Sequence, residues 1–527
     1  MPNLHPYELD QPTTLEGWHQ AFSVTNTGIY RQKSDLQIPT SVAAQLDQYK
    51  KKTLAIMELV KDAMAQGPGA EFRAYGSTWS LSPLPVSTGR QLETARSNRI
   101  LRIPPSLHRA AFKRDHPDGS IYLVEGGCTL AVLNRFLFRE GQSIMAAGTN
   151  NGQTVTGAAS TGTHGGAFKF GSVHDSIMAL HVVVGSDRHI LLQPKSAPAV
   201  SSKVAKNLDA EVVEDDELFY AAQMGLGCFG IVRGVFLLTR PLFLLHGELT
   251  YFDYDSTLKT FLNSLDVSAI ALPQTTPDLY HLGFVLNPND GGNPHRVAIH
   301  TYYEEPYHDD YEPPEPKQGE GLTSGGLEVM SAVMPLLSIW PLSTLVRDQL
   351  NQQVSERYPA GKKITGTIFE LFRSEANVGP TFASGVAVPL DRVSDAIDTI
   401  FGTYASFGKL LPILIEGRYI KQTKALLGTG QDPISCVIEV DSIQNDLIFE
   451  FMDQVCANLE QNGIPFRPHW GKFNRCLIEP QDPGRLMRKQ WGTKVDRWIA
   501  ARKTVFPDPQ LRHLFTNEFI RQVGLGD

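Results

Sequence analysis

Apolar residues recur along this chain at two different spacings, and the change from one to the other divides it. In residues 41–66 they recur at helical spacing behind the start signal Pro39-Thr40-Ser41, which predicts a long amphipathic helix. Shorter strands and helices alternate after this helix, up to about residue 240. We expect strands at 71–75, 121–125 and 231–238, helices at 131–141 and 215–224, and a hairpin of 177–184 with 189–192.

From about residue 240 the pattern changes. Residues 243–252 and several later segments alternate apolar and polar side chains, which predicts an antiparallel sheet with long helices between its strands. Residues 302–326 are rich in acid, Pro and Gly and are expected to form a loop or an insertion. We therefore expect an α+β protein with a first domain at 1–240, a second at 241–465 and a closing segment at 466–527.

Residues 329–346, VMSAVMPLLSIWPLSTLV, form an uncharged run of eighteen residues. This length is marginal for crossing a membrane, and Pro335 and Pro341 interrupt it. We expect a buried pair of helices here. An apolar lid or a contact with one membrane surface is the alternative.

Composition narrows the class of protein. The 527 residues exceed one ordinary core, and the net charge of −8 without a basic cluster argues against a nucleic-acid partner. The five cysteines are far apart and have neither disulfide-framework nor zinc-ligand spacing, so no metal site is expected. The first residues carry no apolar signal-peptide region, so a reducing, cytoplasmic setting is expected.

The segment 148–175 is the most informative part of the chain. It holds seven glycines and five threonines but only two formal charges, Lys169 and Asp175. Glycine lets a backbone approach a large ligand closely, and threonine hydroxyls and backbone N–H groups suit an anion such as a phosphate. The apolar residues interleaved with them require the segment to pack. A cofactor cradle is therefore favoured over a surface loop.

Residues 225–230 form a literal GxGxxG, but they do not predict a nicotinamide cofactor. A dinucleotide-binding fingerprint requires a strand, then the glycines, then a helix whose N-terminus meets the pyrophosphate. Here the predicted order is helix, glycines, strand.

Taken together, three motifs in the first 240 residues resemble the vanillyl-alcohol oxidase flavoproteins, whose FAD-binding domain is of the PCMH type with two α/β subdomains. Residues 73–80, RAYGSTWS, resemble the family's pyrophosphate loop, and 148–175 resemble its second flavin loop. Residues 218–232 resemble the helix and strand that leave the flavin domain, with a backbone group near Ile231 meeting adenine. The resemblance implies that FAD is bound by Arg73, Tyr75, Gly76, Ser77, Thr78, Trp79, Ser80, Gly148, Thr149, Gln153, Thr154, Gly157, Ala158, Thr161, Gly162, Thr163, His164, Gly165, Gly171, Ile231 and Val232.

The second half most resembles the alditol, aldonolactone and class II cholesterol oxidases of this family. Glu416-Gly417-Arg418 resembles their active-site Glu-x-Arg strand, and residues 467–472, RPHWGK, resemble a motif whose lysine faces flavin and substrate. Asp508, Phe515 and Asn517 resemble their closing segment. The resemblance implies a substrate-binding cap at 241–465 with an antiparallel sheet and flanking helices. It also implies that 466–527 returns to the FAD domain and completes the active site.

The chain departs from the family pattern at two positions. Many members attach FAD covalently through a histidine where this chain has Trp79, so we expect tightly held but non-covalent FAD. Without the covalent bond the flavin should have a lower potential and accept hydride less readily. Glu439 stands where alditol oxidases carry a histidine, so polyol specificity does not transfer directly.

The expected chemistry is oxidation of a CH–OH group, with a hydride passing to flavin N5 and reoxidation by O2 or another acceptor. Arg418 and Lys472 are the candidate cations beside the developing alkoxide, and Glu416 the candidate base or orienter. Alternatively, Glu416 and Arg418 form a structural ion pair. His469 is the fourth candidate, with packing against Trp470 as the equal alternative. His164 is expected to shape the cradle through a backbone hydrogen bond.

Two other functions remain open at this point. In the first, the protein is still a flavin enzyme, and the uncharged run at 329–346 and the apolar strand near 243–245 would line a cavity for a sterol, prenyl or polyketide-like substrate. In the second, the chain is a flavin-binding subunit that does not itself catalyse a reaction. The sequence leaves the oligomeric state open.

Overall fold

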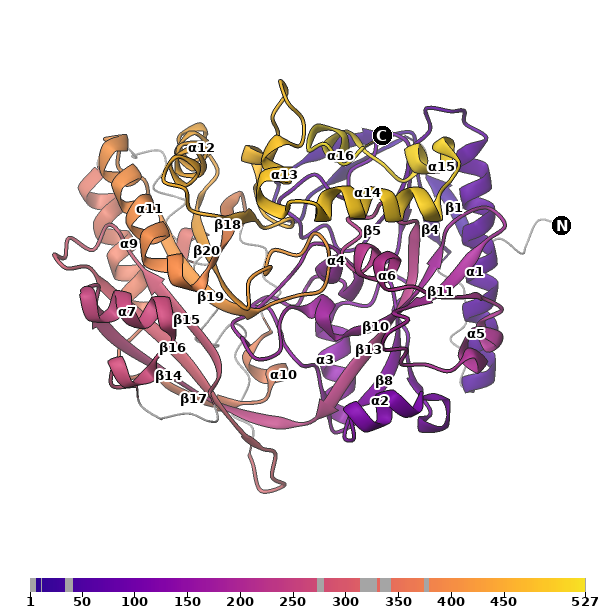
Figure 1. Ribbon diagram of the computed structural model, residues 1–527, viewed down its shortest axis with the longest axis horizontal. Coiled ribbons are helices and arrows are strands. Elements are labelled where there is room, and N and C mark those ends of the chain that lie inside the picture. Colours follow the sequence, from indigo (N-terminus) through magenta and orange to yellow (C-terminus); the bar gives the residue numbers. More distant parts are fainter. Residues whose placement is uncertain are drawn as a thin grey trace.

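The computed structural model describes residues 6–10, 12–33, 41–272, 279–312, 329–331, 343–373 and 379–526. Figure 1 shows two bodies side by side. The N-terminal half of the chain forms one body, and the strands after residue 241 form the other. The last helices lie along the first body, where α15 packs against α1 and α14 against α6.

A four-stranded sheet of order β1-β4-β6-β5 begins the first body. Of its three strand pairings, β1 with β4 is antiparallel, and β4 with β6 and β5 with β6 are parallel. The helix α1 starts at Ser41, whose hydroxyl accepts from the Ala44 N–H, and buries its apolar face against this body. The elements are β1 (Tyr7–Asp10), β4 (Gly28–Gln32), α1 (Val42–Met64), β5 (Phe72–Tyr75) and β6 (Arg90–Glu93), with a separate hairpin of β2 (Thr13–Glu16) and β3 (Ser23–Asn26).

A seven-stranded sheet completes the first body, with the main order β12-β11-β10-β13-β8-β7 and β9 beside β13. Its central strands are buried on both faces because helices cover them (Figure 1). The strands are β7 (Ile100–Ile103), β8 (Ser120–Glu125), β9 (Gln142–Ser143), β10 (Ile177–Val183), β11 (His189–Gln193), β12 (Glu211–Glu214) and β13 (Ile231–Pro241). The helices are α2 (Ala110–Asp115), α3 (Leu130–Arg139), α4 (Val155–Ser160), α5 (Ser202–Leu208) and α6 (Asp216–Ala222).

The second body is an eight-stranded antiparallel sheet of order β17-β14-β16-β15-β19-β20-β18-β21. The helix α11 packs against α7 and α12 beside it. The strands are β14 (Phe243–Asp253), β15 (Leu279–Leu286), β16 (Arg296–Pro306), β17 (Lys363–Gly366), β18 (Thr381–Pro389), β19 (Leu414–Lys421), β20 (Ile434–Ile443) and β21 (Arg467–Pro468). The helices are α7 (Ser256–Ser264), α9 (Ser343–Arg357), α10 (Ile368–Leu371), α11 (Val393–Phe407) and α12 (Asp446–Gln461).

The closing segment leaves the second sheet through β21 and returns to the first body. There α14 packs against α6, and Asn517 donates to the carbonyls of Pro83, Leu84 and Val86 beside β5. The helices are α13 (Arg485–Trp491), α14 (Lys494–Val505), α15 (Pro509–Leu514) and α16 (Glu518–Gln522).

The helices and strands predicted up to residue 252 are confirmed, with ends shifted by a few residues. The predicted α+β class is confirmed as well, and β13 ends at Pro241 while β14 of the other sheet begins at Phe243. The domain limits themselves stay a prediction. The order helix, glycines, strand around 225–230 is also confirmed, because α6 precedes these glycines and β13 follows them.

The predicted loop at 302–326 is wrong in its first part. Residues 302–306 belong to β16, where Tyr302 and Tyr303 are buried and pair with β14 and β15. The aromatic and β-branched residues there favour a strand more strongly than the following acids oppose it. The part of the predicted loop at 313–326 lies outside the described residues.

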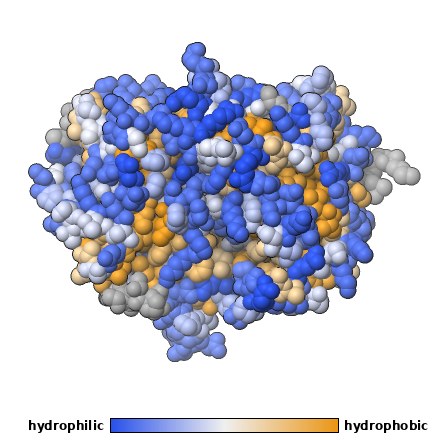
Figure 2. Space-filling model, in the orientation of Figure 1, coloured by the Kyte–Doolittle hydropathy of each residue, from blue (hydrophilic) through white to orange (hydrophobic). Residues whose placement is uncertain are grey.

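Most of the uncharged run at 329–346 also lies outside the described residues, so the expected helix pair stays a prediction. No helix within the described ranges has the length and apolar character that crossing a bilayer requires. The face shown in Figure 2 is mostly hydrophilic, with apolar areas in separate patches.

Candidate functional site

The predicted first flavin loop leaves the end of β5. Arg73 on this strand is buried, and its guanidinium donates to the carbonyls of Leu84 (2.7 Å), Leu226 (2.7 Å) and Phe515 (2.9 Å). Thr78 adopts φ +54°, the left-handed conformation that turns the loop sharply. Arg73 therefore fixes three segments around the loop through hydrogen bonds to their backbone carbonyls.

The predicted second flavin loop packs as expected. The short helix α4 starts at Thr154, whose hydroxyl accepts from the Gly157 N–H at 3.2 Å. Val155, Ala158 and Ala159 are buried beneath it. The polar groups of the loop are thereby left on the opposite side, facing the first loop.

Two glycines let these loops approach each other. A Cβ atom on Gly76 would lie 2.4 Å from the Thr154 hydroxyl, and one on Gly152 would lie 2.1 Å from the Trp79 ring. Both distances are far inside van der Waals contact, so only glycine fits at either position.

Trp79 is held by an aromatic cluster from the N-terminal hairpin. Its ring stacks on Trp18 with centroids 5.8 Å apart and meets the His19 ring edge-on at 4.9 Å. Burial lowers the pKa of His19 to about 4, so its imidazole is neutral at pH 7. The packing that the sequence offered as the simpler explanation of Trp79 is thus present, and the indole has no nucleophilic ring nitrogen.

One cavity, partly open to solvent, joins both loops to the second sheet. Most predicted site residues line it. These are Arg73, Tyr75, Gly76, Ser77, Thr78, Trp79, Ser80, Gly148, Thr149, Gln153, Thr154, Gly157, Ala158, Thr161, Thr163, His164, Val232, Glu416, Arg418, His469 and Lys472. The structure places Gly162, Gly165, Gly171 and Ile231 outside this lining.

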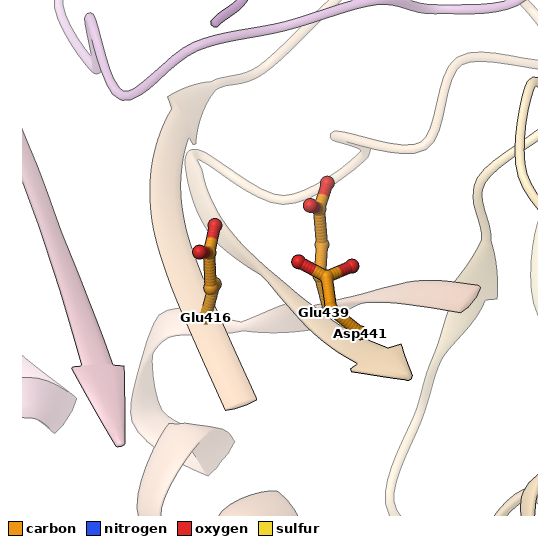
Figure 3. A group of neighbouring side chains, drawn as sticks. All are labelled: Glu416, Glu439 and Asp441. Atoms are coloured by element: carbon orange, nitrogen blue, oxygen red, sulfur yellow. The ribbon is translucent and has the colours of Figure 1, made fainter. Parts of the chain in front are cut away.

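The sheet end of the cavity is densely charged. Glu416 and Glu439 face each other across β19 and β20, and their side chains rise from the same face of the sheet (Figure 3). Arg418 forms ion pairs with both carboxylates, at 3.1 Å to Glu439, and Lys472 lies 2.5 Å from Glu439. Glu416 also accepts from the Tyr358 hydroxyl at 3.0 Å.

The ion pair that the sequence offered as an alternative role for Glu416 and Arg418 is therefore formed. It lies in the cavity wall, however, and the two roles do not exclude each other.

Burial and pairing set the charge states of these groups. Burial raises the pKa of Glu416 although Arg418 lowers it, whereas Lys472 and Arg418 together outweigh burial and hold the pKa of Glu439 well below its usual range. The pair thus holds two carboxyl groups with pKa values pushed in opposite directions, an arrangement typical of acid–base sites.

Two histidines lie between the loops and this charged end. His164 bonds the Gly165 carbonyl through Nδ1 at 3.0 Å, as expected, and its Nε2 lies 3.6 Å from Glu439. The His469 ring lies 5.3 Å from that of His164, and its Nδ1 accepts from the Gly471 N–H. Burial lowers the pKa values of His164 to about 4 and of His469 to about 3, so both rings are neutral.

Several lining residues were not among the predicted site residues, and three of them, His19, Ala383 and Asp441, come from outside the predicted motifs. Asp441 could have been found, because it follows Glu439 by two residues on a predicted strand and so lies on the same face. His19 and Ala383 carry no comparable signal, since only the fold brings the hairpin and β18 to the cavity.

Comparison with known families divides the chain in two. Residues 51–191 match the family described as FAD binding domain, and residues 296–523 match the family described as D-arabinono-1,4-lactone oxidase. The first match includes both flavin loops, and the second includes the charged strands and the closing segment.

Individual relatives agree. The chain is 23% identical over 483 residues to the L-gulono-1,4-lactone dehydrogenase of Mycobacterium tuberculosis, covering 88% of this chain and 92% of that protein. It is 31% identical over 131 residues to a putative D-arabinono-1,4-lactone oxidase of Neurospora crassa, covering 25% and 20%. A solvent-stable cholesterol oxidase has the same fold, with a TM-score of 0.65, 13% identity and coverage of 99% and 100%.

The residues present fit FAD. Gly76 and Gly152 let the two loops approach each other closely, and the buried side-chain oxygen of Gln153, a residue that lines the cavity, has no hydrogen-bond partner in the described part of the chain. Closely approaching backbone with unused hydrogen-bonding groups suits a pyrophosphate. Whether the link to the protein is covalent stays a prediction.

Proposed function

We propose that this chain, a PCMH-type FAD-linked oxidoreductase of the aldonolactone and sterol oxidase branch, oxidises a CH–OH group of a small hydroxylated substrate such as a sugar lactone or polyol. The observation that carries the proposal is the buried cluster of Glu416, Arg418, Glu439 and Lys472 at one end of the cavity, with the two flavin loops at the other. O2 or another acceptor would reoxidise the cofactor.

The first and second flavin loops would hold the diphosphate and the sugar of FAD along the neutral end of the cavity. Bound there, the flavin supplies hydride acceptance at N5. The side chains of β19 and β20, and Lys472 after β21, then surround the place where the substrate's reacting carbon lies.

Each charged residue has a part in this proposal. Arg418 and Lys472 stabilise the oxyanion that forms as the substrate hydroxyl loses its proton, because a fixed cation in a buried site acts without reorganisation. Glu416, with its raised pKa, orients that hydroxyl and takes the proton. Tyr358 and Arg418 hold Glu416 in position through their hydrogen bonds.

The charged lining also separates two substrate classes. Burying a hydrocarbon ligand against these charged groups would remove water from them without replacing its hydrogen bonds, which is costly, whereas hydroxyl and carbonyl oxygens would replace those bonds. We therefore favour a polar substrate over a sterol or prenyl one. A flavin-binding subunit without turnover would gain nothing from this cluster.

Anaerobic mixing of the purified yellow protein with L-gulono-1,4-lactone, D-arabinono-1,4-lactone and a panel of polyols tests the proposal. Bleaching of the flavin absorbance is the expected result, and cholesterol in detergent should leave the colour unchanged. Unchanged colour with every polar compound would contradict the proposed function. Acid precipitation of the same protein should release the flavin into the supernatant, and flavin retained on the polypeptide would refute the non-covalent binding.

A further inference from the structure

Asp441 is a third carboxyl group in the charged cluster. It lies two residues after Glu439 on β20 and so faces the same cavity, with only 2% of its surface exposed. Figure 3 shows Asp441 beside Glu439 and across from Glu416. In register with it, β19 carries Leu414 and β18 carries Ala383, so neither neighbouring strand offers a charged group directly opposite.

The cations of the cluster are engaged elsewhere. Lys472 and Arg418 pair with Glu439, and Arg418 also pairs with Glu416. Asp441 Oδ1 is buried without a hydrogen-bond partner, and Asp441 forms no ion pair within the described ranges. Asp441 lines the cavity, and the hydrogen-bonding capacity of its Oδ1 is unused by the described residues.

A charge count fixes the state of this group. One oxygen from each of Glu416, Glu439 and Asp441 lies within 4.8 Å of the others, and among the described residues two cations, Arg418 and Lys472, form ion pairs with this group of three acids. Carboxylates this close do not all ionise in a buried site. The proton belongs on the acid without a cation, and burial accordingly raises the pKa of Asp441 well above its usual range.

A metal ion is the other way to balance three carboxylates. Arg418 and Lys472 already occupy the positions beside Glu439, so a divalent cation would meet two positive charges at contact distance. A retained proton satisfies the same charge count without this repulsion.

We propose that Asp441 is a neutral carboxylic acid whose O–H donates a hydrogen bond to an oxygen of the substrate, which makes it a specificity-determining residue. This inference rests on the proposed function and names the part of the ligand that Asp441 recognises. The partner is a carbonyl or hydroxyl oxygen close to the carbon that is oxidised, since Glu416, on the neighbouring strand, holds the reacting hydroxyl. The methyl side chain of Ala383 leaves the room for it.

Two variants separate a donor from a base. In Asp441→Ala the donor is lost, and we expect the apparent dissociation constant for the lactone, measured from anaerobic flavin reduction, to rise about 10–100-fold with the limiting rate nearly unchanged. Asp441→Asn keeps an N–H donor at the same place and should stay within about 3-fold of the parent. Asp453→Ala, at a half-exposed carboxyl group on α12, is the matched control.

Other patterns would overturn the inference. If Asp441 acted as an ionised base, Asp441→Asn would lose the limiting rate as fully as Asp441→Ala. If it were only structural, both variants would lose FAD and thermal stability together. Equal dissociation constants in parent and Asp441→Ala would remove it from substrate recognition.

An infrared measurement tests the protonation state without any substrate. The difference spectrum of the FAD-loaded parent minus Asp441→Asn at pH 7 should contain the C=O stretch of a protonated carboxylic acid, shifted in D2O. Absence of this band would overturn the inference whatever the substrate is. Failure of every lactone and polyol to bleach the parent would instead overturn the proposed function, and the band would still decide the state of Asp441.

Discussion

The two ends of the cavity differ in the charge of the residues that line them. At the loop end, Arg73 is the one formally charged residue among the described lining residues, and its guanidinium bonds to backbone carbonyls. At the sheet end, five ionisable side chains from two strands and one loop lie together. The loops achieve close approach through glycine, whereas the strands achieve fixed geometry through their pairing register.

This difference separates two physical tasks. Holding a large anionic cofactor requires many weak contacts from closely approaching backbone, which a neutral, glycine-rich loop provides. Chemistry on a small substrate requires a few charges in fixed positions, because their effect depends on orientation in a buried site. Changes at the sheet end should therefore affect the rate, and changes at the loop end should affect cofactor affinity.

The largest expected effect comes from Arg418→Met. Removing this cation leaves Glu416 and Glu439 facing each other in a buried site, and breaking a buried pair in this way costs about 3–5 kcal/mol of unfolding free energy. We expect flavin reduction to slow about 1000-fold as well, since the oxyanion loses a fixed donor. Urea unfolding and anaerobic reduction would measure the two effects.

Arg475→Met is the control, because Arg475 pairs with Asp453 on the exposed surface of the second body. It should change the unfolding free energy by less than about 1 kcal/mol and leave reduction unchanged. A stable, fully active Arg418→Met protein would contradict the claim that the charges at the sheet end of the cavity determine the rate.

Much of this division could be predicted from the sequence. The glycine and threonine content of 148–175 indicated close approach, and the spacing of Glu416 and Arg418 placed them on one strand face. The pairing of Glu416 with Glu439 could not be predicted, because it depends on the register between β19 and β20. The contact of the hairpin residues Trp18 and His19 with Trp79 could not be predicted either, since local sequence does not specify which distant loop a turn contacts.

Lys472→Met should have the next largest effect, lowering the rate of flavin reduction about 100-fold without emptying the FAD site. Lys472 pairs with Glu439 but is less buried than Arg418, and Glu439 retains Arg418 as a partner. Stopped-flow reduction and the ratio of flavin to protein absorbance would measure this. Equal reduction rates in variant and parent would remove Lys472 from the mechanism, and Lys489→Met, on the surface pair with Glu460, is the control.

Gly76→Ala tests the loop end. The added Cβ would lie 2.4 Å from the Thr154 hydroxyl, and overpacking of this kind should weaken FAD binding roughly 10–100-fold. The limiting rate of reduction of the FAD-loaded fraction should stay close to that of the parent. Gly69→Ala is the matched control because a Cβ there meets nothing within 4 Å. Normal FAD affinity in Gly76→Ala would show that close approach of the loops is dispensable.

The smallest expected effect concerns acid stability at the same end. The folded-state pKa of His19 is lowered to about 4 by burial, below its unfolded value near 6.5. Between these pH values the unfolded chain binds a proton that the folded protein does not, so the free energy of unfolding falls as the pH falls through this window. For His19 alone the loss is about 3 kcal/mol at most.

In His19→Gln this contribution is absent, so stability measured by urea unfolding should fall less steeply between pH 6.5 and 4 than in the parent. His164 and His469 remain and act in the same direction, because burial lowers their pKa values as well. The variant should therefore reduce the slope without abolishing it. Identical slopes in His19→Gln and parent would mean that His19 takes up a proton in the folded protein, and the loop end of the cavity would then carry a positive charge of its own in acid.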